Sequence, residues 1–403
     1  MAMSYEQAKA LDAADPLAEL REQFAIGDDP VAYLDGNSLG RPPHTTIERL
    51  RHVLEQEWAT GLIRGWSAGW TQLPVRVGDL LGATVLGAAP GQVVVADSTS
   101  VNLFKLLHAA AGLRADRSEI VVAEVDFPTD RYLVDAVGAQ RGLTVRWLPA
   151  QPRGGVAVED LADVLSDSTA VVVLSHVDYR SGYLADLASI TKSVQAVGAV
   201  VVWDLSHSAG VAPIALDAAG VDFAVGCTYK YLNAGPGAPA YLYVAQRHLD
   251  AVEQPVPGWF GAADVFAMAG GYAPAADARQ MLSGTPHVLG IVAVEEGLKV
   301  IAQAGIEPIR AKAVALTQMV VELVDDHLLP LGATLQSPRD PSVRGAHVTV
   351  GVPRAREITE ALIERGIVPD FRNPDMIRLG LSPLTTSYAE TWTALDTLRD
   401  LLA

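Results

Sequence analysis

VDFAVGCTYKYLNAGPGAP, residues 221–239, joins an apolar run to a lysine and then to a loop of small residues. The run 221–228 is mostly apolar, which is typical of a strand buried within a parallel sheet. Lys230 follows this predicted strand almost directly. Because ligands of open α/β sheets bind beyond the carboxyl ends of the strands, Lys230 is expected to face a binding site. Taken alone, however, Lys230 is better explained as an ordinary lysine that extends its amine into solvent.

The segments around this stretch predict an α/β fold with a largely parallel sheet. Short runs rich in β-branched residues alternate with helical patterns, as parallel strands covered by helices require. The last hundred residues instead predict a smaller α+β module. We therefore predict an N-terminal arm with part of the small domain over 1–50, a large domain over 51–290 and a small domain over 291–403. The predicted strands of the large domain are 91–97, 119–126, 169–178, 199–204, 221–228 and 239–245.

The length, composition and net charge of the chain argue against several classes of protein. The chain has 403 residues, of which 50% are hydrophobic and 19% charged, so it is long enough for two packed domains. A net charge of −17 argues against nucleic acid as a partner. We expect no membrane span, because no apolar run reaches about 18 residues. The first twenty residues lack the features of a signal peptide, and one cysteine allows no internal disulfide, so a cytoplasmic location is predicted.

Two residues at neighbouring strand ends suggest a cofactor. Asp204 ends the run 199–204, and Lys230 follows the next predicted strand. Pyridoxal phosphate needs a lysine for its aldehyde and a carboxylate facing its ring nitrogen, and this pair fits that need. Asp204 is also compatible with a helix N-cap. The spacing alone therefore favours the cofactor without establishing it.

Other polar residues at the same predicted edge have both a functional and a structural explanation. Ser98, Thr99 and Ser100 precede a predicted helix, where backbone N–H groups bind phosphate or are simply capped. His207 lies three residues after Asp204, and a lone histidine there is more often structural. The nine histidines are scattered and no zinc motif is present, so no metal site is predicted.

Nine motifs, in order along nearly the whole chain, resemble those of the kynureninases, which are fold-type I pyridoxal-phosphate enzymes. Such an ordered set is far more specific than any single motif. The motifs are YLDGNSLGRPP (33–43), GWSAGW (65–70), DSTSVNLFKLL (97–107), DFPTDRY (126–132), WDLSHSAG (203–210), the opening stretch (221–239), PGWFG (257–261), LSGTP (282–286) and IRLGLSPLTTSY (377–388).

The resemblance implies a seven-stranded, mostly parallel sheet in the large domain, and it assigns roles to individual residues. Lys230 would bind the aldehyde of pyridoxal 5'-phosphate, Asp204 would face the ring nitrogen, and Tyr229 and His207 would join them in catalysis. Trp259 and Thr285 would reach the phosphate from the neighbouring subunit of a homodimer. The implied cofactor contacts are Thr99, Ser100, Phe127, Asp130, Ser175, Asp204, His207, Tyr229, Lys230, Trp259 and Thr285.

The same resemblance implies the substrate. Arg378 would grip the α-carboxylate of an amino acid, since its planar fork suits a carboxylate, and Asn37 and Trp66 would line the substrate pocket. The implied reaction is hydrolysis of L-kynurenine to anthranilate and L-alanine, with 3-hydroxykynurenine as a further candidate substrate. Thr285 and Trp66 depart from the animal-type pattern and resemble bacterial members that favour unsubstituted kynurenine. Tryptophan catabolism and NAD biosynthesis are the implied pathways.

Three alternatives remain open from the residues. A class V aminotransferase would use the same lysine and aspartate. A cysteine desulfurase needs a mobile cysteine, and Cys227 lies inside a predicted strand, which disfavours that class. A binding domain that kept only the fold would be expected to lose Lys230, Asp204 or Arg378, and all three are present.

Overall fold

A computed structural model describes residues 3–27, 31–149, 151, 154–268 and 270–403. Within these residues, a seven-stranded sheet has the order β2-β8-β7-β6-β5-β3-β4. Only β8 runs against its neighbours, so the sheet is mostly parallel, as predicted. The strands are β2 (Val93–Val95), β3 (Glu119–Ala123), β4 (Thr144–Leu148), β5 (Thr169–Ser175), β6 (Val200–Asp204), β7 (Phe223–Gly226) and β8 (Tyr241–Val244).

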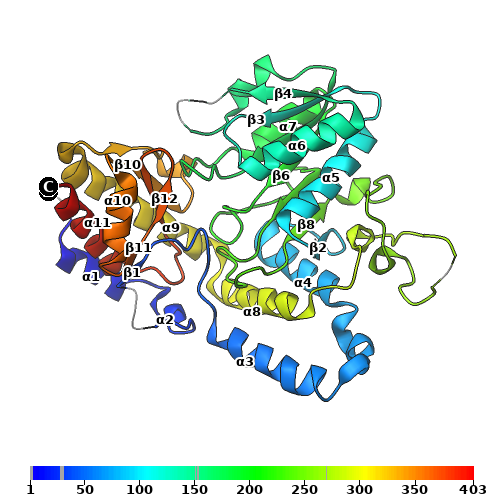
Figure 1. Cartoon of the computed structure of the whole chain (residues 1–403), viewed down its shortest axis with the longest axis horizontal. Helices are drawn as coiled ribbons and strands as arrows, with labels where there is room; N and C mark the ends of the chain where they lie inside the picture. The colour runs from blue at the N-terminus through cyan, green and yellow to red at the C-terminus, as the bar shows by residue number, and fades with distance from the viewer. Residues whose placement is uncertain (1–2, 28–30, 150, 152–153, 269) are drawn as a thin grey trace.

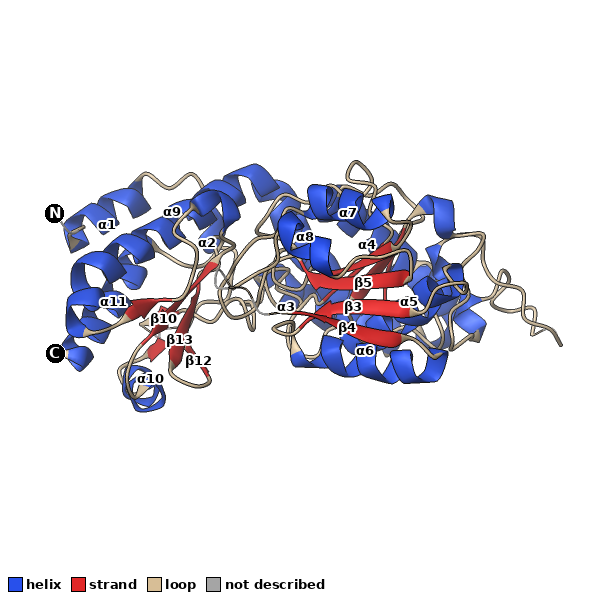
Figure 2. Cartoon of the chain, turned by 90° about the horizontal axis from the view of Figure 1, so that it is seen from above, coloured by secondary structure: helices blue, strands red, loops and turns tan. Residues whose placement is uncertain are grey.

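Helices cover both faces of this sheet (Figures 1 and 2). Alternate strand residues point to opposite faces, so each valine-rich strand supplies two separate cores. One core includes α5 (Thr99–Leu113) and α6 (Pro128–Arg141). The other includes α4 (Leu73–Leu81), α7 (Leu187–Ala196) and α8 (Val288–Ala304). Each fully buried valine or leucine contributes about 1.5–3 kcal/mol, and these two cores hold the strand ends in place.

All six strands predicted from the pattern are present, and β4 is the one that the pattern did not indicate. β4 lies at the edge of the sheet, where Thr144, Arg146 and Trp147 are exposed and only Leu148 is buried. An edge strand with one buried residue has no apolar run to signal it. The seven-stranded sheet that the family resemblance implied is confirmed.

A second body of structure stands beside the large sheet (left in Figure 1). Its antiparallel sheet has the order β12-β13-β10-β9, and β1 pairs with β11. Helix α1 packs on α11, so the two ends of the chain meet in this body. Its strands are β1 (Ala32–Tyr33), β9 (Thr334–Leu335), β10 (His347–Gly351), β11 (Ile367–Val368), β12 (Asp370–Arg372) and β13 (Met376–Gly380).

The remaining helices complete both bodies. They are α1 (Tyr5–Ala13), α2 (Ala18–Arg21), α3 (His44–His52), α9 (Ile306–Leu323), α10 (Ala355–Ile363) and α11 (Tyr388–Leu402). Among the helices that the structure describes, none combines the length and the apolarity needed to cross a membrane. The domain limits near residues 50 and 290 stay predictions, and α8 runs across the second of them.

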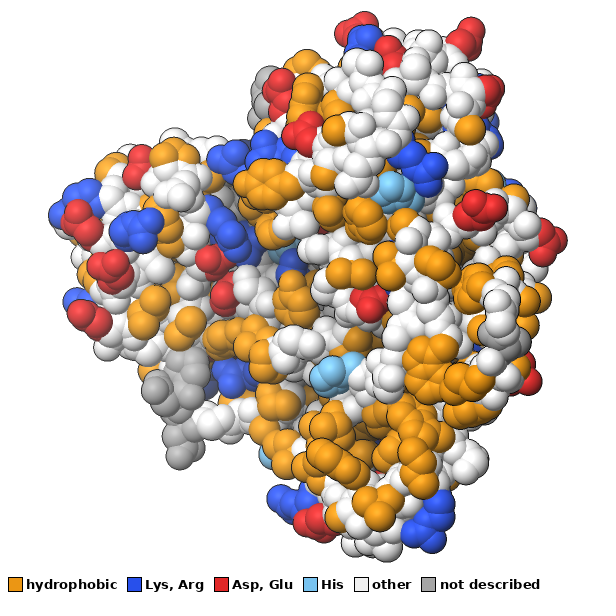
Figure 3. Space-filling view, turned by 45° about the vertical axis from the view of Figure 1, so that its right-hand side comes forward, with side chains coloured by type: hydrophobic (Ala, Val, Ile, Leu, Met, Phe, Trp, Pro, Cys, Tyr) orange, Lys and Arg blue, Asp and Glu red, His pale blue; other side chains and the backbone are white. Residues whose placement is uncertain are grey.

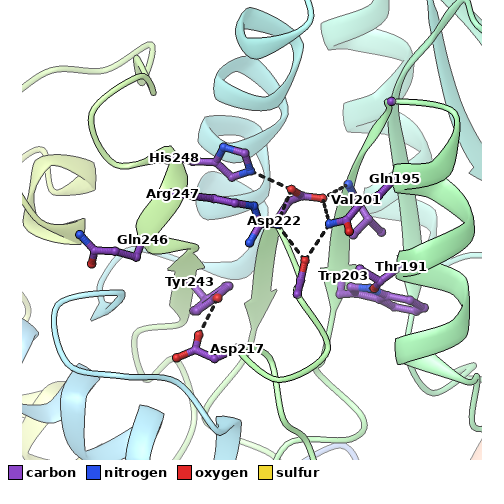
Figure 4. Close-up of polar contacts among 12 residues, drawn as sticks. Thr191, Gln195, Val201, Trp203, Asp217, Asp222, Tyr243, Gln246, Arg247 and His248 are labelled. Atoms are coloured by element: carbon purple, nitrogen blue, oxygen red, sulfur yellow. Dashed lines mark hydrogen bonds and ion pairs between the residues drawn. The ribbon is translucent and has the colours of Figure 1, made fainter.

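The buried carboxylate of Asp222, just before β7, connects several elements at the centre of the sheet through hydrogen bonds (Figure 4). Asp222 accepts hydrogen bonds from the Val201 N–H (3.0 Å), Gln195 (3.1 Å), Arg247 (2.6 Å) and His248 (2.7 Å). Burial alone would raise the pKa of Asp222, but the hydrogen bonds led by His248 hold it below its ordinary value. The ionised carboxylate thus connects β6, α7 and the turn after β8.

We expect Asp222→Ala to lower the free energy of unfolding by about 2–4 kcal/mol, because buried donors lose their acceptor. Urea unfolding followed by circular dichroism measures the loss. Asp250→Ala, at an exposed position nearby in sequence, is the matched control and should change stability by less than about 0.5 kcal/mol. Equal effects of the two substitutions would contradict the role given to Asp222.

Candidate active site

A cavity opens at the carboxyl ends of β5, β6 and β7. Ser175 and Asp204 end β5 and β6, and Lys230 follows β7. The first turns of α5 and α6 close the other side. Nine predicted site residues line this cavity: Thr99, Ser100, Phe127, Asp130, Ser175, Asp204, His207, Tyr229 and Lys230.

Lys230 contacts a buried histidine. Its Nζ lies 2.6 Å from Nε2 of His207, and the two residues follow the neighbouring parallel strands β7 and β6. Burial, and then the positive charge of Lys230, lower the pKa of His207 well below its ordinary value. His207 is therefore neutral near pH 7 and can accept a hydrogen bond from the amine. The ring of His347, which the sequence did not single out, lies 5.6 Å from that of His207 between centroids.

Three carboxyl groups influence one another here, and two of them, Asp130 and Asp204, line the cavity. Asp204 accepts a hydrogen bond from the Ser206 N–H at 2.8 Å. Burial, followed by the charges of Asp204 and Asp126, raises the pKa of Asp130 well above its ordinary value. Burial also raises the pKa of Asp126 to about 7. Oδ2 of Asp130 has no hydrogen-bond partner among the described residues, so this group is free to meet a ligand.

The first turn of α5 can bind an anion. Ser98 caps the helix, and its side chain accepts a hydrogen bond from the Val101 N–H. Thr99 and Ser100 occupy the first turn and face the cavity. The dipole of this fifteen-residue helix and the N–H groups of its first turn favour a phosphate there.

Arg378, on β13, lies in a nearly closed environment between the two bodies, with 1% of its side chain exposed. It donates to the backbone oxygen of Tyr179 at 2.7 Å, and Tyr179 lines the cavity. The amide oxygen of Asn37 accepts from Nε of Arg378 at 2.9 Å when the amide is oriented to satisfy both of its neighbours. A methyl group on Gly380 would lie 1.7 Å from the Asn37 side chain, so only glycine permits this approach.

Arg378 and Asn37 lie outside the lining of the cavity, and so do the other three predicted residues. Trp66 and Trp259 both pack against Phe260, with ring centroids 5.8 and 4.5 Å from it. Thr285 lies in a separate depression together with Asp97. Trp66 was expected in the substrate pocket, and this chain by itself does not bring it there.

The family motif at residues 33–43 also has a packing role that its sequence did not reveal. The N–H of Gly40 donates to the backbone oxygen of Tyr229 at 2.8 Å. A methyl group on Gly40 would lie 2.3 Å from the backbone oxygen of Lys230, so glycine is required for the contact. The N-terminal segment thus supports the turn that carries the lysine.

Tyr229 and Cys227, which shortly precede Lys230 in the chain, differ in their chemical reactivity. Burial raises the pKa of Tyr229, so its hydroxyl stays protonated and can act as a donor. Lys230 Nζ lies 5.9 Å from the centre of the Tyr229 ring. Cys227 is 2% exposed, and burial raises the pKa of its thiol. A buried, protonated thiol is a poor nucleophile.

A mostly parallel sheet, a lysine at its edge and a helix N-terminus that can bind an anion are typical of the fold-type I pyridoxal-phosphate enzymes. The structure resembles that of a cysteine desulfurase from Thermococcus onnurineus NA1, with a TM-score of 0.82 and 18% identity over 95% of this chain and 97% of the other. It also resembles a variant of C-DES with glycine covalently linked to its PLP cofactor (TM-score 0.82, 20% identity, 94% and 99% covered).

The particular family follows from closer relatives. The chain is 43% identical to a kynureninase of Pseudomonas fluorescens, over 98% of this chain and 94% of the relative. It is 44% identical to a kynureninase of Burkholderia pseudomallei, over 98% and 95%. A family model described as the kynureninase C-terminal domain matches residues 309–398. The chain belongs to the kynureninase family.

The raised pKa of Asp126 predicts a pH-dependent stability difference. The protonated carboxyl stabilises the fold below the unfolded pKa near 4, and that contribution is lost as the pH rises through about 7. Asp126→Asn stays neutral, so its stability relative to the unsubstituted protein should rise by about 2–3 kcal/mol between pH 5 and pH 8. Thermal unfolding at both pH values measures this. The exposed Asp135→Asn is the control, and a pH-independent difference for Asp126→Asn would contradict the assignment.

Proposed function

We propose that this protein hydrolyses L-kynurenine to anthranilate and L-alanine with pyridoxal 5'-phosphate as its cofactor. The observation that carries the proposal is the position of Lys230 beside His207, in one cavity with Asp204 and Asp130. The 43–44% identity to kynureninases over 98% of the chain supports the same reaction. Water is the second substrate, and it is added as the Cβ–Cγ bond is cleaved.

The residues of the cavity fit the proposed cofactor. The first turn of α5, with Thr99 and Ser100, would hold its phosphate. Asp204 would face the ring nitrogen, with Asp130 near it, and Phe127 would lie against the ring. Lys230 would bind the aldehyde. The buried Oδ2 of Asp130, which lacks a hydrogen-bond partner within the described part of the chain, supports a polar ligand at this place. When bound, pyridoxal phosphate withdraws electrons from the α-carbon of an amino acid.

The protein's own groups then have separate tasks. Once the substrate amine has replaced it, Lys230 would take the proton from the substrate α-carbon. Neutral His207, 2.6 Å away, would accept a hydrogen bond from the amine and keep it in place. The protonated Tyr229 hydroxyl would donate to an oxygen that gains negative charge, at the phosphate side of the cavity. Arg378 would hold the α-carboxylate and so set the orientation of the substrate.

A homodimer with shared sites is part of the proposal. Trp259 and Thr285 lie away from the cavity of their own chain, and a second copy could bring them to it. Large apolar side chains are exposed, including Ile63 at 77% and Phe266 at 55%, and hydrophobic side chains gather on the lower part of the face in Figure 3. Such surfaces often mark contacts between proteins. A cytoplasmic location belongs to the same proposal.

The structural likeness to cysteine desulfurases concerns the fold alone, at 18% identity. Desulfuration requires a mobile thiolate, and the single cysteine, Cys227, is buried and protonated. An aminotransferase would need a keto acid as acceptor, so the products distinguish it from a hydrolase.

Purified protein supplied with pyridoxal phosphate and L-kynurenine should release anthranilate and L-alanine in equal amounts without any keto acid. Anthranilate fluorescence and amino acid analysis measure the two products. Lys230→Ala should lose at least about a thousandfold in kcat, because the base and the cofactor attachment are both removed. Product formation that depends on an added keto acid would refute hydrolysis.

The substrate preference is a further expectation. With Trp66 and Thr285 at the positions where the sequence departs from the animal type, kcat/KM should be higher for L-kynurenine than for 3-hydroxykynurenine. Initial rates with each substrate over a range of concentrations give both constants. Equal or reversed values would show that these two residues do not set the preference.

A further inference from the structure

The guanidinium of Arg378 has almost all of its hydrogen-bond donors engaged within the protein. Nη1 donates to the backbone oxygen of Tyr179 at 2.7 Å. Nη2 donates both to Oγ of Ser38 at 2.8 Å and to Oδ2 of Asp370 at 2.5 Å. Nε reaches the amide oxygen of Asn37. A guanidinium has five N–H groups, and contacts with the described part of the chain engage four of them, so one N–H, on Nη1, remains for a ligand.

This count matters because arginine holds a carboxylate best through two parallel N–H groups. A guanidinium can form such a pair along two edges, Nη1–Nη2 and Nε–Nη2, and both of these edges include Nη2. The two N–H groups of Nη2 are the ones engaged by Ser38 and Asp370. A carboxylate from outside therefore gains two hydrogen bonds only if one of these partners leaves. Asp370 is the partner that, like the ligand, binds Arg378 through a carboxylate.

Asp370 has a second cation within reach. It lies directly across from Arg378 in the β12–β13 pair, so the two side chains share one face of the sheet. Arg372, two residues along β12, places its Nη2 2.6 Å from the same Oδ2 of Asp370. Nε of Arg372 is buried and has no hydrogen-bond partner among the described residues. Asp370 can therefore leave Arg378 and remain paired with Arg372.

The pair also lies beside the cavity. The guanidinium carbon of Arg372 is 5.8 Å from the centre of the Tyr179 ring, and that ring lies 5.4 Å from Phe127. Tyr179 and Phe127 both line the cavity. Burial, with a contribution from the charge of Asp370, raises the pKa of nearby Asp35 to about 6, whereas the positive charges of Arg378 and Arg372 lower it.

We propose that Asp370 is an internal carboxylate that occupies Arg378 until the α-carboxylate of the substrate displaces it, and that Arg372 then holds the displaced Asp370. The inference rests on the proposed function, in which Arg378 binds the α-carboxylate. Asp370 and Arg372 then determine specificity. A ligand must contribute further contacts to overcome the internal competitor, so the small product L-alanine is bound weakly and leaves.

Asp370→Asn removes the competing charge with little change in shape. In the protein loaded with pyridoxal phosphate, the Kd of L-alanine measured by calorimetry should fall about tenfold. The Kd of L-alaninamide, which lacks the carboxylate, should stay the same. A simple positioning role for Asp370 predicts the reverse, because Arg378 would lose its support and L-alanine would bind more weakly. An unchanged or weaker affinity for L-alanine would overturn the proposal.

Arg372→Gln is a second test of the carboxylate exchange, because it removes the alternative partner of Asp370. Asp370 should then hold Arg378 more tightly, and the Kd of L-alanine should rise about tenfold, again with L-alaninamide unaffected. In the double variant the loss of Arg372 should have no further effect, so its Kd should equal that of Asp370→Asn. Independent, additive effects would refute the exchange. Asp375→Asn, at the exposed turn after β12, is the matched control.

These measurements separate the inference from the proposed function. Failure of the unsubstituted protein to release anthranilate from L-kynurenine would refute the proposed reaction, whatever the binding results. Turnover of L-kynurenine combined with an unchanged Kd of L-alanine in Asp370→Asn would leave the reaction in place and refute the carboxylate exchange. Arg372→Gln tests the exchange by itself if Asp370→Asn does not fold, because Arg372 is partly exposed.

Discussion

The contact between Lys230 and His207 depends on two parallel strands lying side by side. β6 and β7 pair directly, so the residues that follow them emerge at the same edge of the sheet. The distance of 2.6 Å between the amine and the imidazole is a result of that register. A shift of one residue would turn every side chain of a strand to the other face. The hydrogen bond from the Val201 N–H on β6 to the carboxylate of Asp222, just before β7, opposes such a shift. The pairing of these two strands thus determines the chemistry of the cavity.

Much of this arrangement could be predicted from the sequence. Six of the seven strands are apolar runs, and polar residues that end three of them, Ser175, Asp204 and Lys230, meet at one cavity. β4 could not be predicted because its exposed residues carry no periodic signal. Trp66, Trp259 and Thr285 were assigned through the family resemblance, and no local pattern tells whether such residues serve their own chain or another.

The residues around Arg378 were harder to predict for a different reason. Asp370 is close to Arg378 because β12 and β13 form a hairpin with that register, and the three residues of β12 are too few to show an alternating pattern. Gly40 and Gly380 are required by close approaches between segments far apart in the chain. Such contacts depend on the folded structure, and only the short distances in it explain why glycine is needed. The likeness to a cysteine desulfurase and to C-DES, at 18–20% identity, shows how little the fold itself says about the reaction.

The meeting of the two chain ends has a consequence for synthesis on the ribosome. β1, near residue 32, has its partner in β11 near residue 367, and α1 packs on α11, the last helix. At about 5–20 residues per second, the first strand waits roughly 15 seconds to a minute before its partner is made. During that interval the large sheet can form, while the first forty residues remain accessible to chaperones and proteases.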